Sequence, residues 1–404
     1  QDRYGHLLSA YRDALRSLGA RFPSAAALTA AQDAALPREN GPRSVGARAT
    51  AEYDTWRGGS DTSIPVLPFG RTFAHHEAAR AWAECLRGIT TLAVDGSQLP
   101  PWRDASVPIA LVQAGLFENP HSASEPYIKD AFVELLAPDD LIVAEPDTSD
   151  VRTGEFLSYS KEIVNLRRFE LEVSVLAQRM EHHARGGAGQ RGSQAPRVVA
   201  FYDGSLITSF ALKLAPQIRD RYVQGARRLL ETSRDTGIPL VGYIDTSYAR
   251  DIVTLLAGLD ESRALSESRG VHDALLWNGS LRWGDRSPAF LSARNDLNQM
   301  GYGEQRSEIA FVYFQATSDR PPARIEFPRW ILDAGQLDEV LTVVRAETIA
   351  GNGYPYPIET ADAVAVISAH DRAQFYAAFQ EFADRNGLAF GFSRKALSKS
   401  RRRV

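Results

Sequence analysis

The sequence predicts an α/β protein with a mixed β-sheet at its centre and helices flanking the sheet. Two observations support this fold class. Apolar runs of strand length and amphipathic runs of helix length alternate along the chain in the order β-β-β-α-β-α-β. In addition, two of the predicted strands end in the same tripeptide, Asp-Gly-Ser, at residues 95–97 and 203–205. The composition of the 404 residues, 44% hydrophobic and 24% charged, is ordinary for a globular protein.

The elements of this core follow from local patterns. The longest helix is predicted because apolar residues recur at spacings of three and four, from Ile163 to Met180. The predicted strands are short apolar runs bounded by turn residues, and the third of them is ambiguous. In chain order the elements are strands at 90–95, 107–118 and 127–138, a helix at 158–183, a strand ending at Asp203, a helix at about 211–235 and a strand at 238–247.

Further elements are predicted on both sides of this core. Before it, helices are expected, with a stretch rich in Pro, Gly, Ser and Arg that shows no periodicity. After it, a hairpin and two helices are expected. The segments are helices at 1–35 and 75–87, the aperiodic stretch at 36–70, hairpin strands at 308–316 and 323–330, and helices near 336–349 and 359–386.

Composition excludes several classes of protein and site. The single cysteine, Cys85, allows neither an internal disulfide nor a cysteine-based zinc site. No apolar stretch is long enough to span a membrane and the N-terminus lacks a signal pattern, so we expect a cytoplasmic protein. The net charge of −4 argues against a general nucleic-acid coat but allows a local basic channel. The chain has no Gly-x-x-x-x-Gly-Lys motif and therefore no P-loop motor of its own.

The element order is that of the ribonuclease H-like fold, whose enzymes place acids at the ends of strands one and four, on the first helix and on a late helix. Two divalent cations roughly 3.5–4 Å apart need such clustered carboxylates, and Mg²⁺ and Mn²⁺ prefer oxygen ligands. Here Asp95 ends the first strand and Asp203 ends the fourth. Taken singly, each Asp-Gly-Ser is also an ordinary turn signal.

Two glutamates on the helix predicted over 158–183 are candidates for a further ligand. Glu172 lies beside the apolar stripe, next to Val173, and therefore faces the sheet more easily than Glu170 does. The alternative is that both glutamates only solvate the helix. The glycine after each aspartate is expected to let a phosphate or a cation approach the backbone closely.

These motifs resemble those of the NurA nucleases, DNA-end-processing enzymes with a ribonuclease H-like core. The resemblance covers about residues 90–390. It rests on AVDGSQ (93–98), LRRFELE (166–172), FYDGSL (201–206), VGYIDTS (241–247) and GYPYPIETADAVAVIS (353–368). It implies a deoxyribonuclease that depends on Mn²⁺ or Mg²⁺, with two ions, and that acts as a 5'–3' exonuclease and endonuclease.

The resemblance also implies partners and a biological setting. The nuclease would resect DNA ends as a homodimer together with a HerA-type hexameric ATPase, in repair or in anti-phage defence. The absence of a P-loop from this chain agrees with an external motor. Three regions are then expected: an N-terminal helical or irregular extension for docking or dimerisation (1–88), the NurA-like nuclease domain (89–390) and a basic C-terminal tail (391–404) of a kind that is usually solvated.

Carried over by resemblance, the metal-binding acids are Asp95, Glu172 and Asp203, and the late aromatic residue of the catalytic site is Tyr354. Some NurA proteins have a histidine eight residues after that tyrosine, whereas this chain has Asp362, which we include as a fourth metal ligand because a carboxylate also binds Mn²⁺ or Mg²⁺. The alternative makes Asp362 a first-turn acid of the helix over 359–386, where it would complement the helix dipole.

Other interpretations remain open at this point. Asp245, at the end of the fifth strand, is either a group beside the phosphate or an ordinary strand-end residue. Trp102 either stacks on a base or belongs to the core or a dimer interface. Two other functions compete with the leading one: another ribonuclease H-like strand cutter of the Argonaute or transposase kind, and a non-catalytic clamp subunit of the ATPase complex.

Overall fold

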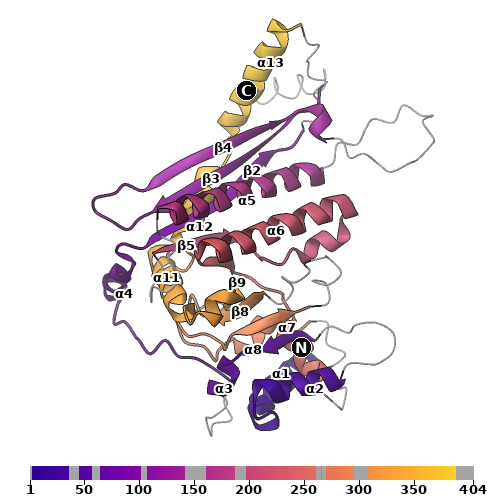
Figure 1. Cartoon of the computed structure of the whole chain (residues 1–404), viewed down its shortest axis with the longest axis vertical. Coiled ribbons are helices and arrows are strands. Elements are labelled where there is room, and N and C mark those ends of the chain that lie inside the picture. Colours follow the sequence, from indigo (N-terminus) through magenta and orange to yellow (C-terminus); the bar gives the residue numbers. More distant parts are fainter. Residues whose placement is uncertain are drawn as a thin grey trace, which may run out of the picture.

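The structure, a computed structural model, describes residues 2–35, 45–56, 64–101, 107–141, 161–186, 197–260, 265, 270–294, 302 and 308–387. Its strands are β1 (Gly46–Ala49), β2 (Thr90–Leu99), β3 (Ala110–Asn119), β4 (Ile128–Leu136), β5 (Val198–Asp203), β6 (Leu240–Ile244), β7 (Phe290–Ala293), β8 (Ile309–Phe314) and β9 (Ala323–Pro328). They form one nine-stranded sheet in the order β1-β7-β8-β9-β6-β5-β2-β3-β4 (Figure 1). Parallel pairing joins β2 to β5 and β5 to β6, and the other described pairs are antiparallel.

Helices surround this sheet. They are α1 (Asp2–Arg21), α2 (Ala25–Ala35), α3 (Glu52–Trp56), α4 (His76–Trp82), α5 (Lys161–Arg185), α6 (Pro216–Thr236), α7 (Asp251–Gly258), α8 (Asp273–Trp277), α10 (Arg329–Asp333), α11 (Leu337–Ala350), α12 (Tyr356–Ala365) and α13 (Ala369–Arg385). The predicted core order β-β-β-α-β-α-β is present as β2, β3, β4, α5, β5, α6 and β6. The predicted α/β fold class with a ribonuclease H-like core is therefore confirmed.

The sheet has a helical layer on each face. Helices α5 and α6 lie across one face (Figure 1), in a core that contains Val94 and Phe169. Helices α11 and α12 cover the other face, in a core that contains Ala93 and Ala361. Ala93 and Val94 are neighbours in β2 and enter different cores, because successive side chains of a strand point to opposite faces.

The segment expected as an N-terminal helical or irregular extension also contributes to the sheet. Its strand β1 pairs with β7 at one edge, with Gly46 opposite Ala293. Its first helix packs against α7 and α8 in a third core that contains Tyr11 and Trp277. The sequence reading placed no strand in 36–70, because β1 (GARA) has no β-branched or aromatic residue to indicate one.

The single helix predicted over 359–386 is in fact two helices. Helix α12 begins at Tyr356 and has Pro357 in its first turn, where a proline is tolerated because the N–H that it lacks would have no partner within the helix. Helix α13 begins after Ser368, whose hydroxyl accepts from the backbone N of Asp371 while the Asp371 carboxylate accepts from the backbone N of Ser368. Asp362 therefore lies in the last turn of α12, and its interpretation as a first-turn acid is wrong.

Two of the sequence-based hypotheses concern residues outside the described ranges, namely Trp102 and the basic tail at 391–404. Within the described ranges, no helix has both the length and the apolar character needed to cross a membrane.

Candidate active site

The two strand-end acids lie on neighbouring parallel strands. Val94 of β2 is opposite Tyr202 of β5, so Asp95 and Asp203 follow at the same edge of the sheet. Two residues before them, Ala93 and Phe201 belong to the core under α11 and α12. Because side chains alternate along a strand, both aspartates point toward that same face.

Gly115 brings α12 close to Asp95. This glycine is directly opposite Asp95 in β3. A Cβ atom at Gly115 would lie 2.5 Å from the backbone N of Ala365 and 2.7 Å from the backbone O of Ala361. Because the glycine has no side chain, α12 packs directly on the strand, and Asp362 of that helix comes within hydrogen-bonding distance of Asp95. The packing of α12 on β3 thus brings Asp362 next to Asp95 at the edge of the sheet.

Glu172 reaches the acids from the opposite face of the sheet. A Cβ atom at Gly96 would overlap Glu172 Oε1 and would lie 2.8 Å from Arg168 Cγ. Arg168 Nη1 donates to Glu172 Oε1 (2.7 Å) and to the backbone O of Gly96 (3.1 Å). The glycine of the first Asp-Gly-Ser copy therefore makes room for a carboxylate and a guanidinium of the protein itself, where the sequence reading expected a phosphate or a cation.

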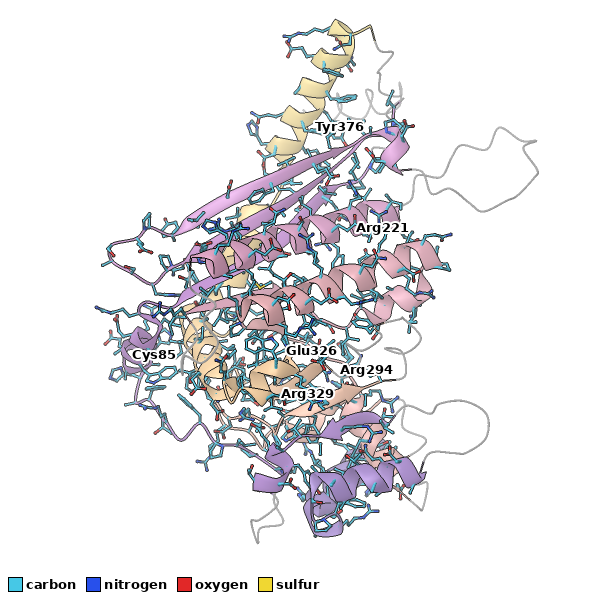
Figure 2. The ribbon with its side chains drawn as sticks, viewed as in Figure 1. Cys85, Arg221, Arg294, Glu326, Arg329 and Tyr376 are labelled. Atoms are coloured by element: carbon cyan, nitrogen blue, oxygen red, sulfur yellow. The ribbon has the colours of Figure 1, made fainter. Side chains whose placement is uncertain are left out.

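Glu170 points away from these acids. Its two carboxylate oxygens accept from Arg221 of α6, which is labelled in Figure 2, at 2.7 and 2.6 Å. Arg167 approaches the Glu170 carboxylate at 3.4 Å. Glu170 therefore ties α5 to α6. Of the two glutamates, Glu172 is the one that the structure places beside the strand-end aspartates.

Tyr354 contacts the second strand-end acid. Its hydroxyl donates to Asp203 Oδ1 at 2.7 Å, and its ring packs edge-to-face on Tyr243 with centroids 5.1 Å apart. The tyrosine follows a tight turn between α11 and α12 in which Asn352 and Gly353 both have positive φ, 55° and 109°. That turn directs the chain back over the ends of β5 and β6.

The electrostatics of these acids show that they share one environment. Burial, the hydrogen bond with Asp362 and the charge of Asp203 raise the pKa of Asp95 to about 6. Burial raises the pKa of Glu172 to about 7, although the charge of Arg168 acts in the opposite direction. Burial and the charge of Asp362 also raise the pKa of Asp203, against the lowering effect of the Tyr354 hydroxyl. Such mutual effects require close carboxyl groups in a site of low polarity.

Within the described ranges, no group of three or more His, Cys, Asp and Glu side chains stands in an arrangement ready to bind a metal ion. The carboxylates are directed to protein partners: Glu172 to Arg168, Asp203 to Tyr354, and Asp95 to Asp362. The chemistry of the donors nevertheless suits a divalent cation, because all of them are carboxylate oxygens and their like charges repel one another.

Asp245 lies at the margin of this acid cluster. It follows β6, and Arg320 Nη1 approaches its Oδ2 at 3.4 Å. Its charge also contributes to raising the pKa of Asp203. The structure thus places Asp245 near the acids, in an exposed ion pair with Arg320.

The structure adds Glu326, which the sequence reading did not identify. Glu326 is buried in β9, and its Oε2 accepts from Ser205 Oγ and from the backbone N of Leu206, both at 2.8 Å. Arg324 Nε donates to its other oxygen at 2.7 Å, and Figure 2 shows Glu326 inside the molecule. Glu326 therefore holds the loop that follows Asp203. A signal was available: Arg324 and Glu326 place two charges on one face of an otherwise apolar strand.

Comparison with known proteins completes the description of the site. A family model described as the NurA domain matches residues 89–367. Solved structures similar to the chain include NurA with manganese (10% identity, 72% of this chain and 89% of that chain, TM-score 0.41) and NurA bound to dAMP and manganese (12%, 69% and 85%, 0.34). The catalytic domain of human endonuclease V is also similar (14%, 78% and 92%, 0.31). No curated protein matches. The structural similarities are weak, whereas the family match covers more than half of the chain.

Proposed function

The chain belongs to the NurA family, and on this premise we propose that it is a metal-dependent deoxyribonuclease that degrades DNA ends. The observation that carries the proposal is the meeting of carboxylates from both faces of the sheet. Asp95 and Asp203 come from adjacent strands, Asp362 from α12, and Glu172 from α5 on the opposite side. Such clusters support phosphodiester hydrolysis with divalent cations.

Asp95, Glu172, Asp203 and Asp362 would hold Mn²⁺ or Mg²⁺, and we propose two ions. When bound, the cations supply an activated water and stabilise the departing oxygen. The protein's own residues orient the ligands. Tyr354 fixes one oxygen of Asp203 and leaves the other available, while Arg168 fixes one oxygen of Glu172. Burial raises the pKa of Asp95 to about 6, so Asp95 must lose its proton before it can hold a cation.

The partners proposed are DNA ends, a second copy of the chain and a HerA-type hexameric ATPase, in repair or in anti-phage defence. The lack of a Gly-x-x-x-x-Gly-Lys motif supports the need for an external motor. The N-terminal region 1–88 is proposed as the docking or dimer surface.

A cleavage assay with purified full-length protein tests the proposal. End-labelled linear DNA, single- and double-stranded, is incubated with Mn²⁺, with Mg²⁺ or with EDTA, with and without the ATPase and ATP. We expect cleavage that EDTA abolishes and that Asp203→Asn abolishes without loss of folded structure. Glu170→Gln is the matched control, because it changes a carboxylate that faces α6 and should leave cleavage intact. Cleavage by Asp203→Asn at the wild-type rate would refute the site.

A further inference from the structure

A large cavity separates the N-terminal region from the α11 side of the molecule. Its volume is about 2120 Å³. Its walls come from segments far apart in the sequence, and several of them precede the part of the chain matched by the family model. They are α1, residues 64–79, the loops at 280–285 and 316–319, and the end of α11 with the turn that follows it.

Aromatic rings form part of the wall of this cavity. Phe73 and Trp283 line it, and both are half-buried, with ring centroids 5.6 Å apart. Phe69 packs behind them, 5.8 Å from Trp283 and 5.1 Å from Trp82. The guanidinium of Arg345 lies 4.7 Å from the Phe69 ring on the buried side. The two lining rings are therefore held in place from behind and present fixed apolar surfaces to the cavity.

The described lining of the cavity holds three arginines and three aspartates, and the exposed charges outside ion pairs are mainly positive. Arg71 and Arg282 are exposed in its wall and form no ion pair with any of the residues that the structure describes. Asp285 is buried in the wall, where its carboxylate accepts from the backbone N of Phe69 (2.8 Å) and of Arg282 (3.0 Å).

The remaining charged groups in the wall do not make the exposed, unpaired charge of the cavity negative. Arg16 is paired with Asp13 at 2.6 Å. His75 uses its Nδ1 to accept from the backbone N of Ala78, and His76 is exposed beside it. Asp319 is the other carboxylate in the wall. Two exposed arginines, Arg71 and Arg282, thus face one exposed carboxylate that is not paired with an arginine of the wall, Asp319.

Two segments of the chain that line the cavity lead on to the acid cluster. Gly353 lines it and immediately precedes Tyr354, whose hydroxyl donates to Asp203. Asp319 lines it and immediately precedes Arg320, which pairs with Asp245. The two segments touch, because a Cβ atom at Gly353 would lie 2.6 Å from Thr317 Cγ2. The wall of the cavity is therefore one residue along the chain from two groups that contact the acids.

We propose that this cavity binds a single-stranded stretch of the DNA substrate next to the cleavage site. Bases stack on Phe73 and Trp283, and phosphates pair with Arg71 and Arg282. Proteins that bind single strands without sequence preference combine these two features, a cationic groove and aromatic stacking surfaces. The inference rests on the proposed nuclease function and adds to it a strand-binding subsite built largely by the N-terminal region.

The first test measures binding without cleavage. Fluorescein-labelled oligo(dT) of about 20 nucleotides is titrated in EDTA, and binding is followed by anisotropy at several salt concentrations. We expect the double variant Arg71→Gln/Arg282→Gln to bind about tenfold more weakly, and the slope of log K against log salt to shrink by about 0.7 per lost phosphate contact. Phe73→Leu should weaken binding about fivefold with little change in the slope.

Arg329→Gln is the control, because Arg329 is an exposed arginine on α10 whose partner is Asp333, and it does not line the cavity (Figure 2). It should bind as the wild type does. Wild-type affinity and salt slope in the double arginine variant would overturn the strand-binding subsite. Thermal unfolding of each variant shows whether it is folded, and the arginine variant stays decisive if Phe73→Leu is unstable.

The second test separates this inference from the nuclease proposal. Bis(p-nitrophenyl) phosphate contains one phosphodiester, and it has neither further phosphates to pair with Arg71 and Arg282 nor bases to stack on Phe73 and Trp283. With Mn²⁺, the double arginine variant should hydrolyse this ester at the wild-type rate but cleave single-stranded DNA with a KM about tenfold higher. An equal loss on both substrates would refute a strand-binding role. If the wild type hydrolyses neither substrate, the nuclease proposal fails, while the binding data in EDTA still decide whether the cavity holds DNA.

Discussion

Asp362 occupies a place in its helix where a negative charge is unfavourable. It lies in the last turn of α12, where the partial negative charge of the helix dipole opposes a carboxylate. It also lies against Asp95, and burial together with that contact raises the pKa of Asp95 to about 6. The charge of Asp362 is thus repelled by the helix dipole and by the carboxylate of Asp95, and both effects lower the stability of the metal-free protein. A bound cation would remove this repulsion, which favours a role for Asp362 in binding a cation.

Substitution of Asp362 tests that role. Asp362→Asn removes one of the four carboxylates and should reduce cleavage steeply, with partial recovery at high Mn²⁺. Asp362→His should remain active with Mn²⁺ but lose the activity supported by Mg²⁺, because Mg²⁺ prefers oxygen ligands more strongly than Mn²⁺ does. Initial rates on labelled DNA over a metal titration provide the measurement. Unchanged rates in both variants would remove Asp362 from the site.

The same contact predicts a pH dependence of stability in the metal-free protein. The pKa of Asp95 is raised in the folded state, so its contribution to stability is present below the unfolded pKa of roughly 4 and is lost as pH rises through about 6. We expect the free energy of unfolding to fall across this window by roughly 1–3 kcal/mol, and to fall less in Asp362→Asn. Urea unfolding in EDTA at several pH values measures both. An identical pH profile in the variant would contradict the contribution of Asp362 to the raised pKa of Asp95.

The two glutamates of α5 show how far a local pattern predicts a site. The apolar stripe of the helix was enough to prefer Glu172 over Glu170, and the structure places Glu172 at Gly96. The partners of Glu326 could not be predicted in this way. They lie in the loop after β5, more than a hundred residues away in the chain, and only the pairing of the strands brings them together.

The same distinction holds for helices and strands. Helix α5 was predicted because its periodicity is internal to the segment. Strand β1 was missed because its pairing with the distant β7 defines it, and α12 and α13 were merged because their apolar residues continue across a break set by the Ser368 cap. The periodicity of apolar residues does not predict an element whose position depends on a single capping residue or on pairing with a distant strand.

Strand β9 is expected to control the loop that carries Asp203. Glu326→Gln preserves the size of the side chain but removes the charge that accepts from Ser205, Leu206 and Arg324. We expect a loss of roughly 1–3 kcal/mol in the free energy of unfolding, because Arg324 loses one of its buried carboxylate partners and keeps Asp251 at 2.9 Å. We also expect the affinity for Mn²⁺, measured as the concentration that gives half-maximal cleavage, to be roughly 10–100-fold weaker, because the loop no longer holds Asp203 in one position. Chemical denaturation and metal titrations of cleavage measure the two effects.

Glu118→Gln is the matched control for that variant. Glu118 is a buried carboxylate in β3 that pairs with Arg179 at 2.6 Å, away from the loop after β5. Its substitution should lower stability in a similar way and leave the metal dependence of cleavage at the wild-type value. Equal changes in both variants would mean that Glu326 acts only on overall stability.

The assembly of the whole molecule is the remaining proposal. Light scattering should show a dimer of the purified chain, and a further increase in mass when a HerA-type ATPase is added. The docking surface within 1–88 is best tested by substitutions of exposed residues, because removal of α1 would uncover the apolar core beneath it, including Trp277. A stable monomer whose mass does not change with the ATPase would contradict the proposal.

The edge pairing of β1 with β7 also has a consequence for biosynthesis. During translation the first strand emerges long before its partner, and the surfaces of α7 and α8 that cover α1 are made late as well. Until then Tyr11, Leu15 and Leu18 have no native core to enter. Contacts so distant in sequence form slowly and leave apolar surface exposed to aggregation. We therefore expect the nascent N-terminal region to be prone to aggregation until β7, α7 and α8 have been made.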